Sequence, residues 1–369
     1  MSKAAELAKS GETLTNQPSG RKNIVTNGAM QVAQRSTSTT GIGASAGYFT
    51  LDRYKIETAS SAGRLTMTQT ADGPSGFANC LKLDCTTADT SIHADEYLFL
   101  RQKFEGQDLQ QLKKGTSDAE SVTVSFYVKG DQAATYVCEL KDNDNSRNNT
   151  QAFAVTTSWN RIELTFAADT TGALDDDNAS SFEINIWLHA GSGYTGGTFA
   201  SNTWASVTNA NRYAGSRTSF YDSTDREFFL TGVQMEIGSQ ATNFEHRSFG
   251  EELALCYRYT QRHPSSDSGE NFNVIAQGMA SNATDTFHPC RHYVTMRAEP
   301  SLTNSGNFRV RYAATAVGTS AATTLYDDGS NSDISFLLGT VGSGLTAGQS
   351  IILEQNNDVD AHIILDAEL

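Results

Sequence analysis

Short runs of alternating apolar and polar residues recur along most of the chain. The clearest run covers residues 121–128, where Val122 and every second residue up to Val128 are apolar and the residues between them carry hydroxyl groups. A similar run covers residues 182–188. A period of two predicts strands with one buried face. Eight or more such runs, separated by turn-rich segments, predict a large two-sheet sandwich of jelly-roll type over residues 21–248.

The period changes after this predicted sandwich. Ser248 stands three residues before Glu251, which is the spacing of a capping box at a helix start. Apolar or small residues then follow at three-and-four spacing from Leu253 to Thr260. The residue before a proline avoids helical backbone angles, so Pro264 predicts that the helix ends at His263-Pro264. We therefore predict a short connecting helix over residues 249–264.

Both ends of the chain carry smaller predicted elements. Six short strand candidates predict a smaller C-terminal β-sandwich over residues 265–369. These candidates cover residues 272–277, 292–297, 308–313, 334–338, 350–355 and 362–365. Residues 1–20 predict a short helical segment, or else a loose tail, because a helix of about two turns is marginal alone in water. The predicted fold class is all-β, with these two short helical segments.

Composition narrows the classes of function. The chain has 369 residues and a formal net charge of −15, so phosphate backbones would repel it and nucleic acid is an unfavourable ligand. The sequence contains no run of about eighteen apolar residues, so it predicts no membrane-spanning helix. The N-terminus has no apolar signal core. Five cysteines without a CxxC pair predict buried free thiols in a reducing cytosol, and neither a disulfide framework nor a zinc site.

Motifs for catalysis or metal binding are weak. Residues 142–145 and 175–178 are acidic turns that could offer oxygen atoms to calcium, but the first departs from an EF-hand at Arg147 and Phe153. Asp and Asn also favour turns for local reasons. His288 and His292 flank a proline and sit too far apart on a strand to share a metal ion. No nucleophile-elbow or phosphate-loop motif occurs. We expect no enzyme activity, no metal and no cofactor.

Aromatic residues gather in a strand-poor stretch rich in glycine, serine and asparagine, residues 191–219. Sugars bind to flat aromatic faces with hydrogen-bonding groups beside them. Tyr194, Trp204 and Tyr213 are therefore candidate glycan contacts. The alternative is that these rings pack beneath the loop or at a contact between subunits.

Several stretches resemble one family of virion proteins. They are NIVTNGAMQVAQR at residues 23–35, LDR at 51–53, SFYVK at 125–129, DNDNSR at 142–147 and the long run at 231–258. The most specific part is GVQMEIGSQATNFEHR at residues 232–247. These stretches resemble a β-sandwich family of structural proteins in tailed bacteriophages, notably podovirus-like phages of marine cyanobacteria and other marine bacteria.

The resemblance implies a tail fibre or tail-associated adhesin with a carbohydrate-binding-like sandwich. Such proteins are usually homotrimers. The N-terminal segment, with an apolar face of Ala4, Ala5, Leu7 and Ala8, would dock on a tail adaptor or tail-tube protein of the virion. The distal part would meet a host-surface glycan or outer-membrane component. The protein would fold in the host cytoplasm before it joins the virion tail.

Two other functions stay open. One is a capsid decoration or head spike protein of the same virion, because no coiled-coil shaft is visible in the sequence. The other is a glycan depolymerase. The family-like run offers polar residues for catalysis, but we interpret Glu245 and Arg247 as a structural corner that leads into the helix start at Ser248 and Glu251. A corner with buried backbone needs such hydrogen-bond partners.

Overall fold

The computed structural model describes Lys3 and residues 21–264, 271–312, 319–327 and 329–369. The predicted docking face of Ala4, Ala5, Leu7 and Ala8 lies outside these residues. The chain divides into two compact units, Met1–Phe249 with Leu369, and Gly250–Glu368. This division falls next to the predicted boundary at residue 248. Each unit is considered by itself below.

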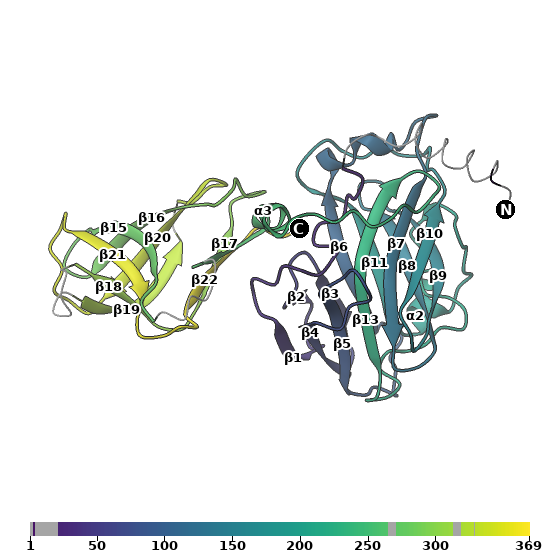
Figure 1. Cartoon of the computed structure of the whole chain (residues 1–369), viewed down its shortest axis with the longest axis horizontal. Coiled ribbons are helices and arrows are strands. Elements are labelled where there is room, and N and C mark those ends of the chain that lie inside the picture. The colour runs from purple at the N-terminus through teal and green to yellow at the C-terminus, as the bar shows by residue number, and fades with distance from the viewer. Residues whose placement is uncertain (1–2, 4–20, 265–270, 313–318, 328) are drawn as a thin grey trace. The chain divides into compact units, whose positions relative to one another are not determined.

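The first unit is a sandwich of two antiparallel sheets (Figure 1). The six-stranded sheet has the order β1 (Ser38–Ile42), β4 (Arg64–Thr70), β5 (Cys80–Thr87), β13 (Glu227–Ile237), β7 (Val122–Gly130) and β10 (Asn160–Phe166). The seven-stranded sheet has the order β12 (Ala205–Ser206), β9 (Arg147–Val155), β8 (Ala134–Asp142), β11 (Ser180–Ala190), β6 (Tyr97–Glu105), β3 (Lys55–Ala59) and β2 (Gly47–Tyr48). The all-β class is therefore confirmed.

The predicted alternation defines the core of this sandwich. The apolar row from Val122 to Val128 in β7 is at most 5% exposed. The facing sheet contributes the row from Phe182 to Leu188 in β11, which is buried in the same cluster. Burying one face of each sheet against the other is what a period of two in the sequence requires.

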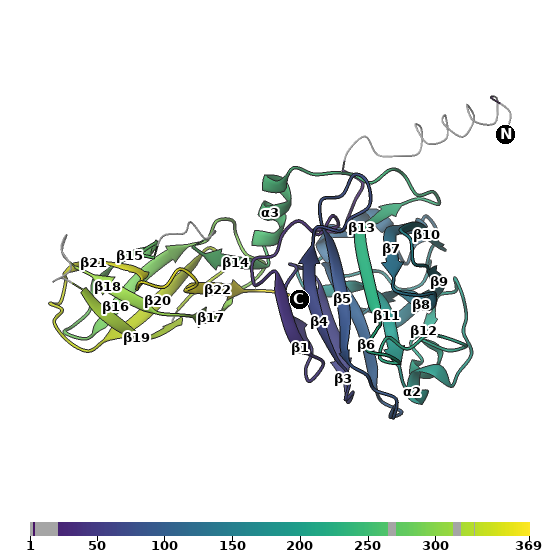
Figure 2. The same cartoon turned by 60° about the horizontal axis from the view of Figure 1, so that its bottom comes forward.

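Strand β13 runs through the middle of its sheet, between β5 and β7 (Figure 2). Its pairing with β7 shifts register between Thr231 and Gln234. Gly232 lies at this bulge with a φ of 62°, and a Cβ there would come within 2.7 Å of the ring of Phe77. Only glycine adopts this conformation without strain and also leaves room for the ring.

The stretch between β11 and β13 has little regular structure, as predicted. It contains α2 (Ser192–Thr195), the two-residue strand β12 and the 3-10 helix η3 (Asn209–Asn211). Two further short 3-10 helices follow β6, η1 (Gly106–Asp108) and η2 (Gln110–Leu112). The loops therefore stand on a rigid frame, which is the usual position for binding residues.

The second unit is built from strands, but not as the small sandwich that we predicted. Six strands form a closed barrel in the order β15 (Val274–Ala280), β16 (Asp285–Arg291), β20 (Ile334–Val341), β19 (Thr319–Asp327), β18 (Phe308–Arg311) and β21 (Ser350–Gln355). A separate sheet consists of β14 (Thr260–His263), β22 (His362–Asp366) and β17 (Ser301–Ser305). The barrel closes because β15 pairs with both β16 and β21, which removes its free edges.

The predicted connecting helix is too long. Helix α3 (Phe249–Tyr257) begins where predicted, but Thr260–His263 forms β14 and pairs with β22. All four residues of β14 are buried, and the strand pairing satisfies their backbone groups. Helical spacing of apolar residues up to Thr260 could not reveal a partner strand about a hundred residues later in the chain.

The predicted strand at residues 292–297 is also wrong. These residues are irregular, and the strand lies earlier, as β16. Pro289 is part of β16 opposite Phe336, but β16 pairs with β15 only at Thr286 and Phe287. The proline therefore lies beyond the β15 pairing, where its missing N–H is not needed.

Two predictions about the whole chain can be compared with the described residues. All five cysteines are buried and free, as expected from their number and spacing. No helix in the described part of the chain has both the length and the apolar character to cross a membrane.

Candidate functional site

The family-like run at residues 232–247 forms a hydrogen-bonded corner. One carboxylate oxygen of Glu245 accepts the backbone N–H groups of Lys22, at 2.6 Å, and Asn23, at 2.7 Å. Arg247 donates to the backbone carbonyls of Val25, at 2.9 Å, and Asn23. These residues therefore fasten the last part of the sandwich to its first part, more than 200 residues earlier.

The other polar residues of the run support the same corner. The carboxylate of Glu236 is buried and accepts hydrogen bonds from the backbone N–H of Thr242, at 2.8 Å, and from its hydroxyl, at 2.7 Å. Gln234 donates to Glu236 and accepts the backbone N–H of Glu245 at 2.8 Å. These groups hold the backbone rather than converge on a cavity, which matches our structural interpretation of the run. Ser248 directly precedes α3, and Glu251 is in its first turn.

Two of the three candidate glycan contacts lie together, because the backbone N–H of Tyr213 donates to the carbonyl of Tyr194 at 3.0 Å. Tyr213 is only 2% exposed, and its hydroxyl donates to the backbone carbonyl of Thr218 at 2.7 Å. Because the ring of Tyr213 lies in the core, a sugar cannot stack on it, and Tyr213 is not a glycan contact in this structure. Trp204 is half-buried and donates to the carbonyl of Ala167 at 2.7 Å. The ring of Trp204 lies 6.0 Å from that of the buried Phe182, whereas Tyr194 is half-exposed beside Tyr97 and Trp187.

The rings around Tyr194 belong to the outer face of the seven-stranded sheet. Tyr194 contacts Tyr97 with ring centroids 5.4 Å apart and Trp187 at 5.5 Å. Phe99 stacks between Tyr97, at 5.3 Å, and Trp187, at 4.5 Å. Because Trp187 and Phe99 are buried beneath, the rings that reach the surface are Tyr97 and Tyr194.

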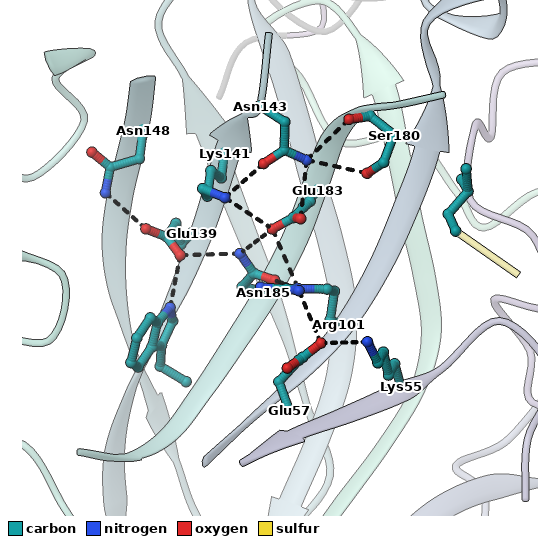
Figure 3. A network of polar contacts seen from close by, with 12 residues as sticks. Lys55, Glu57, Arg101, Glu139, Lys141, Asn143, Asn148, Ser180, Glu183 and Asn185 are labelled. Atoms are coloured by element: carbon teal, nitrogen blue, oxygen red, sulfur yellow. Dashed lines mark hydrogen bonds and ion pairs between the residues drawn. The ribbon is translucent and has the colours of Figure 1, made fainter. Parts of the chain in front are cut away.

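A row of charged and amide side chains continues from these rings along the same face (Figure 3). Strand β6 places Arg101 opposite Asn185 of β11 and Lys55 of β3, and Lys103 opposite Glu183. Sequence analysis missed these residues of β6. The available signal was the sequence YLFLRQKFE, in which aromatic and cationic residues occupy every second position of one strand.

Arg101 links the Glu183 and Asn185 part of this row to Glu57 and Lys55 (Figure 3). Its Nη1 lies 3.0 Å from Oε1 of Glu57, and its Nε donates to Oδ1 of Asn185 at 3.0 Å. The same Nε lies 3.3 Å from Oε2 of Glu183. The ammonium of Lys55 lies 2.6 Å from Glu57. These contacts fix the side chains of three strands before any ligand arrives, which reduces the entropy lost on binding.

One end of the row is buried around Glu139. Its two carboxylate oxygens accept hydrogen bonds from Asn148, Asn185, Trp187 and both sides of the Arg212 guanidinium, at 2.7–3.1 Å. Burial alone would raise the pKa of Glu139, but the charge of Arg212 and these hydrogen bonds lower the pKa to about 2. Arg212 also covers the ring of Trp187 at 4.5 Å. The loop before β13 is thereby locked onto the sheet.

The cations of the row reach solvent in part. The side chains of Lys55 and Lys141 are 23% and 22% exposed, and that of Arg101 is 14% exposed. An exposed, pre-arranged set of charges next to aromatic rings is suited to a polar ligand with flat apolar faces. We call Tyr97, Tyr194, Arg101, Lys103 and their neighbours on this open part of the sheet the β6 face.

In the first of the two acidic turns predicted as weak calcium candidates, residues 142–145, the carboxylate of Asp142 is already engaged by protein groups. The buried carboxylate of Asp142 lies 2.5 Å from the ammonium of Lys114 and accepts the backbone N–H of Asn145 at 3.0 Å. Lys114 also lies 3.1 Å from Asp169. Within the described residues, no group of three or more histidine, cysteine or acidic side chains has the geometry of a metal site.

A buried cluster elsewhere in the sandwich has the residue types of a hydrolytic triad. The imidazole of His189 lies 2.8 Å from the hydroxyl of Ser219 and 3.3 Å from the carboxylate of Glu96. His189 has no exposed surface, and burial lowers its pKa although Glu96 opposes this effect. The Ser219 hydroxyl also accepts the backbone N–H of Tyr221 at 3.1 Å. The cluster thus joins β11 to two loops.

No protein-family model matches the chain, and no curated protein matches it. Its structural neighbours include carbohydrate-binding modules. One is a xylan-binding domain of Paenibacillus barcinonensis, at 12% identity and a TM-score of 0.29, covering 60% of this chain and 100% of that one.

Two further neighbours are similar. A family 11 module of Clostridium thermocellum, solved with a mixed-linked tetrasaccharide, has 12% identity and a TM-score of 0.27 and covers 56% of this chain and 99% of that one. A family 30 module has 12% identity and a TM-score of 0.30, with coverage of 59% and 96%. At such scores the likeness carries no argument about the function of this chain.

Proposed function

We propose that this chain is a structural protein of a tailed-bacteriophage virion, of the short tail-fibre type, that contacts a host-surface glycan through the β6 face. It would attach to the tail through its N-terminal segment and act as a homotrimer without enzymatic activity. The observation that carries the glycan part is the β6 face itself, with Tyr97 and Tyr194 beside the hydrogen-bonded row around Arg101. The virion part is supported by the resemblance at residues 232–247.

The absence of enzymatic activity is part of this proposal. The polar residues of the family-like corner serve the backbone, as the two amides held by Glu245 illustrate. His189 lacks a surface on which a substrate could be positioned. A general base has to reach the proton that it removes, so we interpret its cluster as a structural clamp. Weak binding at each of three subunits would then be strengthened by multivalency.

The glycan part can be tested with the full chain and immobilised host-surface polysaccharide. We expect the wild-type protein to bind, and Tyr97→Ala and Arg101→Ala each to weaken binding about tenfold or more. Lys129→Ala is the matched control, because Lys129 also lies over aromatic rings, at 4.3 Å from Phe229, but on the other sheet. Equal binding by all four proteins would remove the β6 face from the proposal.

The virion part needs a separate measurement. A label on the N-terminus, located by electron microscopy of intact particles, should appear on the tail. Label on the head would favour the capsid decoration or head spike function instead. Appearance of new reducing ends after incubation with host polysaccharide, lost in Ser219→Ala but not in a folded surface variant, would contradict the non-enzymatic proposal and support a depolymerase.

A further inference from the structure

The charge of the β6 face differs from that of the whole chain. The chain carries 42 acidic residues against 27 lysines and arginines. On and beside the β6 face, four cations, Lys55, Arg101, Lys103 and Lys141, stand against three carboxylates, Glu57, Glu183 and the buried Glu105. The neighbouring Glu139 is balanced by Arg212. A cationic region on such an acidic surface is an attractive site for an anion, and the surrounding negative charge disfavours binding elsewhere.

Among these cations, Lys103 has an ammonium group that could still bind a ligand. It is half-buried on β6 opposite Glu183, and its ammonium forms no hydrogen bond or ion pair with the residues that the structure describes. Burial lowers the pKa of Lys103, although Glu183 opposes this effect. The Glu183 carboxylate is itself engaged by Lys141, Asn143 and Asn185. An anion placed beside Lys103 would therefore meet a cation that is partly desolvated and not yet neutralised.

Arg101 adds a second donor beside Lys103. It uses Nε and Nη1 for Asn185 and Glu57, while Nη2 forms no hydrogen bond or ion pair with a residue that the structure describes. Arg101 and Lys103 are two positions apart on β6, so their side chains project from the same face. Tyr97 lies four positions before Arg101 on that face. From Tyr97 to Lys103 the strand spans about 20 Å, which gives room for several sugar rings.

We propose that the β6 face binds an anionic polysaccharide, one that carries carboxylate or sulfate groups. Arg101 and Lys103 bind the charged group, and Tyr97 and Tyr194 stack on neighbouring sugar rings. This inference rests on the proposed function and adds the chemical class of its glycan. An arginine with a free edge suits a planar carboxylate or a sulfate, and a lysine adds charge without a fixed direction. A neutral glycan would leave the Lys103 ammonium partly desolvated without a partner.

The test uses the full chain and titration calorimetry with four probes: polygalacturonate, dextran sulfate, neutral dextran and single-stranded DNA. We expect at least one of the two anionic polysaccharides to bind, and the affinity to fall about tenfold or more from low to high ionic strength. Lys103→Gln and Arg101→Gln should each weaken that binding about tenfold. Lys129→Gln, on the other sheet and paired with Asp72, should leave it unchanged. Urea unfolding midpoints equal to wild type show that the variants fold.

The outcomes distinguish failure of the anionic class from failure of the glycan-binding function. Binding to host polysaccharide that survives high salt, chemical reduction of its carboxyl groups and Lys103→Gln would overturn the anionic class and leave the glycan function standing. No binding to any polysaccharide, host preparation included, would overturn both. DNA binding as tight as polygalacturonate binding would show a general polyanion surface and overturn the inference.

Discussion

At the scale of single residues, Glu139 is a buried carboxylate whose charge is balanced by Arg212. It is fully buried, and Arg212 holds it with both guanidinium edges at 2.8 and 2.7 Å. We predict that Glu139→Gln lowers the free energy of unfolding by about 3–5 kcal/mol, because it leaves Arg212 buried without a counter-charge. Chemical denaturation followed by tryptophan fluorescence measures this change.

A surface ion pair gives the matched control for Glu139. Glu120 lies 2.8 Å from Lys113, and their side chains are 38% and 52% exposed. Solvent screens such a pair, so Glu120→Gln should cost less than about 1 kcal/mol. Similar losses for the two variants would mean that the buried pair does not lock the loop onto the sheet.

Asn23 is the residue that ties the start of the sandwich to β13. Its side chain donates to the carbonyl of Val233 at 3.1 Å and accepts the N–H groups of Val25 and Met235 at 3.0 and 3.1 Å. We predict that Asn23→Ala costs about 2–4 kcal/mol, because it leaves buried backbone groups without partners. The exposed Asn209→Ala should change stability by less than about 0.5 kcal/mol in the same denaturation experiment. A loss under 1 kcal/mol at Asn23 would show that water replaces its side chain.

At the scale of elements, the barrel strand β16 carries a buried titratable group. His288 is fully buried, and neither of its ring nitrogens has a hydrogen-bond partner in the described structure. Burial lowers the pKa of His288 to about 4, from an ordinary value of 6.5. As the pH falls from 6.5 to 4, the unfolded chain takes up a proton that the folded barrel does not. The second unit therefore loses stability in this window, and the loss levels off below pH 4.

We predict that His288→Leu removes about 2–3 kcal/mol of this acid sensitivity, measured as the difference in unfolding free energy between pH 7 and pH 4. The variant keeps part of the slope, because burial, together with the charge of His292, also lowers the pKa of His263 to about 4. His362→Leu, at a ring that bonds to the carbonyl of Asp360 near the surface, should keep the full slope. If the unfolding free energy of His288→Leu fell between pH 7 and pH 4 as much as that of the wild type, the ring of His288 would be protonated in the folded barrel at no energetic cost.

The same elements show what the sequence can and cannot predict. Rows such as Val122–Val128 can be predicted because each strand buries one face, so apolar residues occur at every second position of the sequence. The strand at Thr260–His263 was assigned to a helix because its partner, β22, is about a hundred residues away. The barrel closure has the same cause, since β15 pairs with β21 across a separation of about eighty residues. Pairing partners leave no periodic trace in a single sequence.

The candidate site follows the same rule. The predicted contacts are aromatic residues of the loop, but Tyr213 is buried and the ring of Trp204 lies against the buried Phe182. The β6 face depends on register, which places Arg101 between Asn185 and Lys55. Alternation in β6 marks an outward face with aromatic and cationic residues, yet it cannot say which charges of other strands lie beside them. The contact of Glu139 with Arg212 joins residues 73 positions apart and was invisible for the same reason.

At the scale of the whole molecule, the buried apolar residues form separate cores. One large cluster lies within the first unit, and two smaller clusters lie within the second. All three tryptophans, Trp159, Trp187 and Trp204, lie in the first unit. Tryptophan fluorescence therefore reports on the sandwich alone. Because each unit buries its own core, each should fold by itself.

We predict that a fragment of residues 21–249 folds and unfolds in urea at the same midpoint as the tryptophan signal of the full chain. In the full chain, Leu353→Ala should cost the barrel about 2–5 kcal/mol, because Leu353 is fully buried in the second unit. Circular dichroism at strand wavelengths should show that loss, while the tryptophan midpoint stays in place. A fragment that aggregates, or a tryptophan midpoint that moves with Leu353→Ala, would show that the sandwich depends on the barrel for its stability.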